Sequence, residues 1–133
     1  MIQAAKAGRF VTETSAVYGL VSNIAMASKI ADAARKCHLA VHNFDRAEPL
    51  ITHAIQKKPK LVILDWDACE AEAFKTLKEL AKNADLKGVP AVGYVSGARE
   101  VLKQEAQRAG CYRVYSKTEF IKEMELIMAR YAK

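Results

Sequence analysis

Long apolar runs are absent from this sequence. No stretch reaches the roughly 18 consecutive apolar residues that a membrane-spanning helix requires. Residues 1–15 contain Lys6, Arg9 and Glu13 and no continuous hydrophobic segment, so they lack the pattern of a secretory signal. We therefore expect neither a membrane span nor export, and no membrane among the partners.

Cysteine is also scarce. The three cysteines, Cys37, Cys69 and Cys111, are odd in number and far apart. They form no CxxC pair, and no cluster of cysteine and histidine has the spacing of a zinc site. The pattern predicts three reduced thiols, which indicates a cytoplasmic protein rather than a disulfide-stabilised secreted one.

Glycine-rich phosphate loops are missing as well. Neither GxGxxG nor GxxxxGK followed by Ser or Thr occurs, so a nucleotide-binding enzyme has little support. The 133 residues suit one domain, and 51% apolar with 27% charged residues is typical of a globular chain. The net charge is +6, but Lys and Arg are scattered without a block of five or six, which is typical of a solvated surface.

Short apolar runs alternate with longer segments of helical periodicity. Residues 61–64 are apolar at every position, which is typical of a strand buried on both faces. The alternation predicts an α/β domain with a doubly wound, five-stranded parallel sheet and helices on both faces. We assign residues 1–15 to an N-terminal extension and 16–133 to the domain. The expected strands are 17–21, 38–44, 60–65, 91–95 and 113–115, and the expected helices are 24–37, 46–57, 69 or 70 to 83, 97–108 and 118–131.

Polar residues follow most of the expected strands. In an open parallel sheet, ligands bind beyond the carboxyl ends of the strands. A carboxylate and an ammonium at the same edge favour either a phosphoryl-transfer or acid–base site or a surface ion pair, and the sequence alone leaves both open. These residues are Ser22, Asn23, Asp65, Asp67, Ser96, Ser116 and Lys117.

Three segments in a common register resemble the receiver domain of bacterial response regulators. They are Leu61–Asp65 (LVILD), Val89–Val92 (VPAV) and Ala109–Lys117 (AGCYRVYSK). The resemblance extends more weakly to residues 17–44. It implies a flavodoxin-like fold with strand order 2-1-3-4-5, and a cytoplasmic role in two-component signalling or a phosphorelay.

The resemblance also implies roles for individual residues. Asp65 takes the place of the aspartate that accepts a phosphoryl group from a histidine kinase. Lys117 and Ser96 are the phosphate-binding candidates. Asp65, Asp67 and Asn23 are the candidate ligands of Mg²⁺.

This sequence departs from the family at several of these positions. The family's acidic pair falls on Ser22 and Asn23, and its hydroxyl residue falls on Val95, one residue before Ser96. Mg²⁺ requires anionic oxygen ligands, so the resemblance is closest to the atypical or pseudo-receivers, with weak Mg²⁺ binding at most. We expect a stand-alone, non-enzymatic signalling domain that acts by protein–protein interaction. The alternative is a working receiver phosphorylated on Asp65.

Three aromatic residues are candidates for partner binding. Trp66 follows Asp65 directly and either contacts a partner or packs over the sheet end. Tyr112 and Tyr115 lie on the face that receivers use to dock output partners or a second receiver. The partners expected are therefore a histidine kinase, another receiver or a second copy of this chain.

Nucleic acid binding is a further alternative. The basic charge and residues 88–95 loosely resemble the small ribosomal proteins that bind kink-turn RNA. That family has an α-β-α sandwich with a mixed sheet, which the repeated βα alternation argues against. Nucleic acid is therefore not expected as a partner from the sequence.

Overall fold

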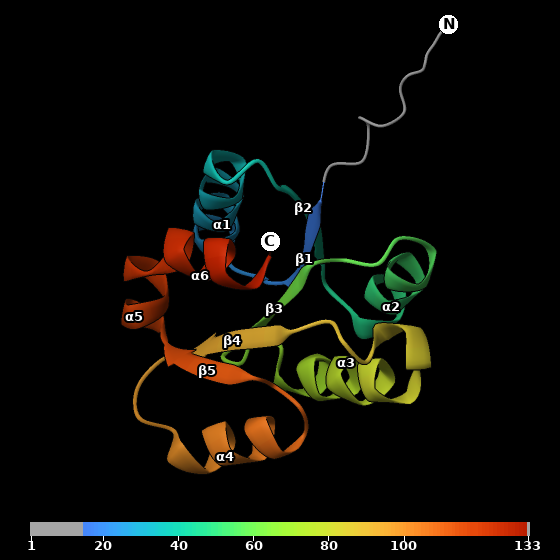
Figure 1. Cartoon of the computed structure of the whole chain (residues 1–133). Helices are drawn as coiled ribbons and strands as arrows, with labels where there is room; N and C mark the ends of the chain where they lie inside the picture. Colours follow the sequence, from blue (N-terminus) through green and yellow to red (C-terminus); the bar gives the residue numbers. More distant parts are fainter. Residues whose placement is uncertain (1–14, 133) are drawn as a thin grey trace, which may run out of the picture.

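The sheet has the predicted class and strand order. The structure is a computed structural model that describes residues 15–132, so the expected N-terminal extension lies outside the described residues except for Ser15. All neighbouring strands are parallel, and their order is β2-β1-β3-β4-β5 (Figure 1). The strands are β1 (Ala16–Leu20), β2 (Ala40–Phe44), β3 (Leu61–Asp65), β4 (Ala91–Val95) and β5 (Arg113–Ser116).

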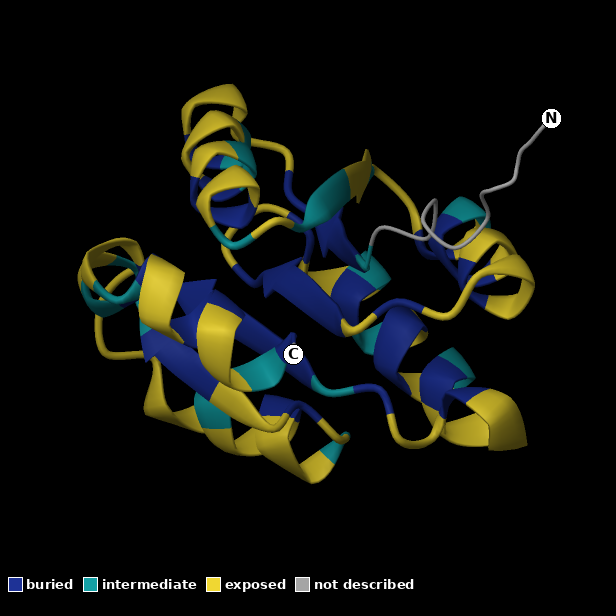
Figure 2. Cartoon of the chain, turned by 45° about the horizontal axis from the view of Figure 1, so that its top comes forward, coloured by how far each residue is buried: buried dark blue, intermediate teal, exposed yellow. Residues whose placement is uncertain are grey.

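Helices cover both faces of the sheet, and each face has its own hydrophobic core. Figure 2 shows the result, with the central strands buried, the edge strand β2 partly exposed, and helices that expose their outer sides. One core lies beneath α1 (Ile24–Lys36), α5 (Lys117–Lys122) and α6 (Met124–Tyr131). The other core lies beneath α2 (Ala47–Gln56), α3 (Glu70–Lys82) and α4 (Glu100–Arg108), with the short 3-10 helix η2 (Ala84–Leu86) beside it.

The central strand β3 supplies side chains to both cores, because successive residues of a strand point to opposite faces. Val62 and Leu64 belong to the core beneath α2, α3 and α4. Leu61 and Ile63 belong to the core beneath α1, α5 and α6. This two-sided burial explains the uninterrupted apolar run, and it places Asp65, the next residue in the alternation, on the α1, α5 and α6 face.

Two expected element boundaries were wrong for local reasons. His38 has a left-handed φ of 59°, and the Leu39 N–H bonds to the Ala34 carbonyl at 2.8 Å. These residues therefore close α1, and β2 begins only at Ala40. Gly97 has a φ of 73°, a conformation that glycine adopts readily and that a helix excludes, so α4 begins at Glu100.

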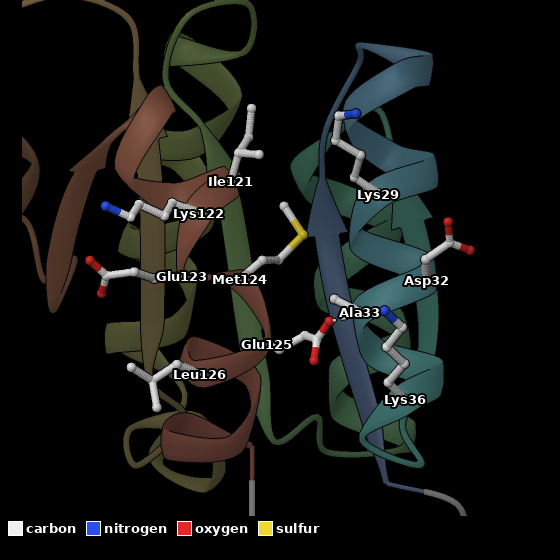
Figure 3. A pocket seen from close by; sticks show the side chains of 10 residues that line it. All are labelled: Lys29, Asp32, Ala33, Lys36, Ile121, Lys122, Glu123, Met124, Glu125 and Leu126. Carbon is white, nitrogen blue, oxygen red and sulfur yellow. Dashed lines mark hydrogen bonds and ion pairs between the residues drawn. The ribbon is translucent and has the colours of Figure 1, made fainter.

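The predicted helix 118–131 is divided into α5 and α6 at Glu123. Its dihedrals, φ −106° and ψ 15°, are not helical. The Glu123 N–H still bonds to the Glu119 carbonyl at 3.0 Å, and its carbonyl accepts from Ile127 at 2.9 Å, so the division is a kink rather than a loop. A groove of about 580 Å³ lies between α1 and this kink (Figure 3). Lys36 and Glu125 form an ion pair of 3.1 Å that joins its two sides.

Within residues 15–132, no helix is both long and apolar enough to span a membrane.

Candidate functional site

The parallel sheet brings the predicted site residues to one edge, the carboxyl ends of the strands. We call this edge the Asp65 rim. Asp65 ends β3, and Asp67 lies in the turn that follows it. Asn23 follows β1, Ser96 follows β4, and Lys117 follows β5. The rim therefore contains every residue that was predicted to bind phosphate or Mg²⁺.

Asp65 is buried, with 2% of its surface exposed. Its Oδ1 atom accepts hydrogen bonds from the backbone N–H groups of Asp67 at 2.9 Å and Ala68 at 3.1 Å. An aspartate that accepts from the backbone two residues later forms an Asx-turn, which fixes the loop between β3 and α3. One carboxylate oxygen is thus committed to holding the backbone.

Asp67 and Ser96 bind each other across the β3–α3 and β4–α4 loops. The Ser96 backbone N–H donates to Asp67 Oδ1 at 2.9 Å, and the Ser96 hydroxyl donates to Asp67 Oδ2 at 2.7 Å. Both carboxylate oxygens of Asp67 are therefore engaged. The Ser96 hydroxyl donates its proton within this pair, so it is not directed at the Asp65 carboxylate.

Asn23 has a structural role at the start of α1. Its Oδ1 atom accepts the Met26 N–H at 2.9 Å, as expected of an asparagine at the N-cap position. Its amide oxygen satisfies a backbone donor that the helix would otherwise leave unpaired.

The residues of the rim do not fit a Mg²⁺ site. Mg²⁺ requires octahedral oxygen ligands, and protein sites usually supply them through carboxylates. Asp67 and Asn23 are engaged in a loop pair and a helix cap, and Asp65 holds its turn through Oδ1. One carboxylate oxygen, Oδ2 of Asp65, is thus left for a metal ion among these three residues. Across residues 15–132, no group of three or more His, Cys, Asp or Glu side chains is placed to hold a metal ion.

Lys117 does not form the rim ion pair that was one interpretation of the sequence. It is the first residue of α5, which Ser116 caps by accepting the Glu119 N–H at 3.1 Å. Lys117 is half-buried. No carboxylate of the described residues lies within 4 Å of its ammonium.

Tyr94 is a site residue that the sequence did not reveal. It pairs with Asp65 in the β3–β4 register, it is 1% exposed, and its ring stacks on Phe120 at 5.0 Å. Its buried hydroxyl has no hydrogen-bond partner among the described residues. Burial, followed by the negative charge of Asp65, raises the pKa of Tyr94. A polar aromatic in an otherwise apolar strand was the available signal, but its position beside Asp65 depends on strand register.

Two of the three aromatic residues proposed for partner binding are buried. Trp66 is fully buried, and its indole packs edge-on against Phe74 with a centroid distance of 4.8 Å. Tyr115 is 1% exposed and belongs to the core beneath α1, α5 and α6. Neither side chain can contact a partner in this conformation, because each is covered by its own fold. Tyr112, which is 69% exposed, is the one that reaches the surface.

The thiols should differ strongly in reactivity. Cys111 is buried, and burial raises its pKa to about 12. Burial also raises the pKa of Cys69, and the Asp65 charge adds to this effect. Since the thiolate is the reactive form, we expect the half-buried Cys37 to react first with a thiol reagent. Mass spectrometry of partly labelled protein checks this, and rapid labelling of Cys111 in the folded protein would contradict it.

Comparison with known proteins identifies the fold. No protein-family model matches the chain, and a search of curated proteins gives no match. Solved structures do match. A response regulator from Hahella chejuensis is 18% identical, with a TM-score of 0.78 over 89% of this chain and 95% of that one.

Two further matches agree. The chemotaxis protein CheY4 of Vibrio cholerae is 13% identical, with a TM-score of 0.76 over 90% of this chain and 99% of that one. The receiver domain of the sensor histidine kinase PA1611 from Pseudomonas aeruginosa is also 13% identical. It was solved with a magnesium ion in its active-site cleft and has a TM-score of 0.75 over 90% of this chain and 98% of that one. The chain therefore has the receiver fold, as the resemblance predicted.

Proposed function

Given the receiver fold, we propose that this chain is a non-enzymatic signalling domain that acts by binding other proteins. We further propose that its Asp65 site does not support Mg²⁺-dependent phosphorylation. The observation that supports this best is the pairing of Asp67 with Ser96, in which both carboxylate oxygens and the hydroxyl already have partners.

The chemical reason lies in the charge that phosphoryl transfer develops. A metal ion neutralises this charge in the reaction of ordinary receivers and of other phosphoryl-transfer proteins. Here two of the family's acidic positions hold Ser22 and Asn23, and a metal could recruit Asp67 only by displacing Ser96. Asp65 consequently remains as a buried carboxylate that organises its own loop.

Protein binding then falls to the surface of the domain. Tyr112 and Val101 are both large and exposed, at 69% and 70%, and they belong to the α4–β5 connection and to α4. A second receiver, a histidine kinase or another copy of this chain are the partner classes that the receiver resemblance implies. Tyr112 therefore stays a candidate for partner contact.

The test uses Trp66, the single tryptophan, as a fluorescent reporter directly after Asp65. We expect no saturable change in its emission during titration with Mg²⁺ at millimolar concentration, followed by beryllofluoride as a mimic of the phosphoryl group. A saturable change that disappears in Asp65→Asn would contradict the proposal and make the working phosphoacceptor the better interpretation.

A gain-of-binding variant shows that the reporter works. Ser22→Asp/Asn23→Asp restores a carboxylate at both positions of the family's acidic pair, and aspartate still caps a helix well. We expect this variant to acquire a saturable response to Mg²⁺. Isothermal titration calorimetry provides a second readout that does not depend on the environment of Trp66.

A further inference from the structure

The edge of the sheet opposite the Asp65 rim is rich in unpaired positive charge. It consists of the connections that lead from each helix into the next strand (Figure 1). Four lysines on these connections and one arginine at the end of α4 are exposed. None has a carboxylate within 4 Å among residues 15–132. We call them the basic edge: Lys57, Lys58, Lys60, Lys87 and Arg108.

These residues are scattered in sequence but neighbours in space. The Lys60 N–H bonds to the Ala16 carbonyl at 2.8 Å, and the Val62 N–H bonds to Pro90 at 3.0 Å. The Tyr112 N–H bonds to Ala91 at 2.7 Å. The connections before β3, β4 and β5 therefore lie side by side.

Two hollows mark this edge. One, of about 500 Å³, is lined by Ser15, Ala16 and residues 56–60, and so by all three lysines of the α2–β3 connection. The other, of about 310 Å³, lies between Lys87 and Gly110.

Helix capping explains only part of this charge. All helices of a doubly wound fold end at this edge, and a cation in the last turn offsets the negative end of a helix. That accounts for Arg108 at the end of α4. It does not account for Lys58 and Lys60, which lie outside every helix. Among the described residues, Asp85 is the one acid in these connections.

An exposed aromatic residue accompanies the basic edge. Tyr112 lies on the α4–β5 connection, and one edge of its ring meets Tyr131 at a centroid distance of 5.6 Å. The other large apolar side chains that are exposed all lie on helices: Ile24, Ile55, Val101, Ile121 and Leu126. The edge therefore lacks the apolar cluster that a membrane-surface helix or the centre of a protein interface requires.

We propose that the basic edge binds single-stranded nucleic acid, with the lysines and Arg108 on phosphates and Tyr112 stacked on a base. Proteins that bind single strands combine a positively charged track with aromatic platforms in this way. The basic edge precedes the three neighbouring strands β3, β4 and β5, which span about 10 Å at spacings of 4.8 Å, so a short stretch of nucleic acid backbone can lie along it. No helix or two-stranded ribbon projects from this edge among the described residues, so it lacks an element to enter the groove of a duplex.

The test is fluorescence anisotropy with labelled oligonucleotides of about 12 nucleotides, as ribose and deoxyribose forms, over a range of salt. Five phosphate contacts predict a slope of about −3.5 for log K against log salt, from 0.7 per contact on single strands. Binding of either oligonucleotide supports the proposal, and any preference identifies the natural form. Tyr112→Ala should weaken binding at fixed salt and leave the slope unchanged, because stacking releases no counterion.

Two variants with the same change in net charge distinguish binding at the basic edge from a general effect of positive charge. Lys57→Gln/Lys58→Gln/Lys60→Gln should reduce the steepness of the slope by about 2 and lower affinity at least about tenfold at low salt. Lys29→Gln/Lys78→Gln/Lys122→Gln removes the same charge from exposed positions on α1, α3 and α5 and should bind like the unmodified chain. Far-ultraviolet circular dichroism confirms that each variant is folded.

Three results would overturn the proposal. One is no binding at about 50 mM salt, where such contacts are strong. Another is equal loss of affinity in the two triple-glutamine variants, which would indicate net charge alone. The third is tighter binding to vesicles rich in phosphatidylserine than to either oligonucleotide, which would assign the edge to a membrane surface. None of these outcomes bears on the metal titration at Asp65.

Discussion

Replacing Gly93 by alanine should lower the free energy of unfolding by about 3 kcal/mol, at the upper end for an overpacked core. Gly93 lies in the buried strand β4. A Cβ atom there would overlap Nε1 of Trp66 and lie 2.7 Å from the carbonyl oxygen of Leu64. The indole cannot move away because Phe74 packs against it, and the carbonyl belongs to the neighbouring strand.

Urea unfolding followed by circular dichroism measures this loss. Gly88→Ala is the matched control, because no atom lies within 4 Å of the added Cβ atom. It should change stability by less than about 1 kcal/mol. Combining Gly93→Ala with Trp66→Phe should cost less than the sum of the single changes, because the smaller ring removes part of the overlap. An unchanged midpoint for Gly93→Ala would show that β4 does not approach the indole this closely.

Stability should also fall steeply at alkaline pH, by about 4 kcal/mol between about pH 8 and about pH 11. Burial raises the pKa of Cys111 and of Tyr115 to about 12 each, and it raises the pKa of Tyr94 and Tyr18. The unfolded chain releases the thiol proton above about pH 9 and the tyrosine protons above about pH 10, while the folded chain retains them. The unfolded state then binds fewer protons, so unfolding becomes easier as the pH rises.

Denaturant titrations at several pH values, fitted to one linkage curve, measure the effect. At alkaline pH, the free energy of unfolding of Tyr94→Phe should fall less steeply with pH than that of the unmodified chain. The difference in slope should be about 1.4 kcal/mol per pH unit, the value for one proton. It should not lower stability at neutral pH, because the hydroxyl it removes has no partner. Identical curves for the Tyr94 variant and the unmodified chain would contradict the account.

The sequence predicted most of the fold because the signals involved are local. The all-apolar residues 61–64 required burial on both faces, and that single observation indicates a central strand of a parallel sheet. The alternation of such runs with helical periodicity then predicted the topology. The kink at Glu123 and the late start of β2 after His38 were missed, because each depends on a backbone conformation that neither residue type indicates.

The site was harder to predict because its contacts connect distant residues. That Asp67 would bind Ser96, 29 positions away, depends on how two loops lie across the rim. Whether Trp66 would face solvent or the core depended on Gly93 leaving space for the indole. The basic edge was missed for the same reason, since its cations come from two connections and from the end of α4. Composition and motifs identify residue types along the chain, whereas these features depend on which distant residues the fold brings together.

The distribution of charge between the two ends of the domain affects how this molecule encounters its ligands. Acidic side chains occupy the first turns of α2, α3 and α4, and basic ones occupy the last turns of α1, α3 and α4. Many of these charges are paired at their own end, as Glu48 is with Arg46 and Glu70 with Arg99. The unpaired cations of the basic edge therefore make that end the more positive one. An approaching polyanion turns the basic edge toward itself before contact, and the Asp65 rim then faces the opposite way. Ligands at the two ends arrive from opposite directions, so occupancy of one end leaves the other accessible.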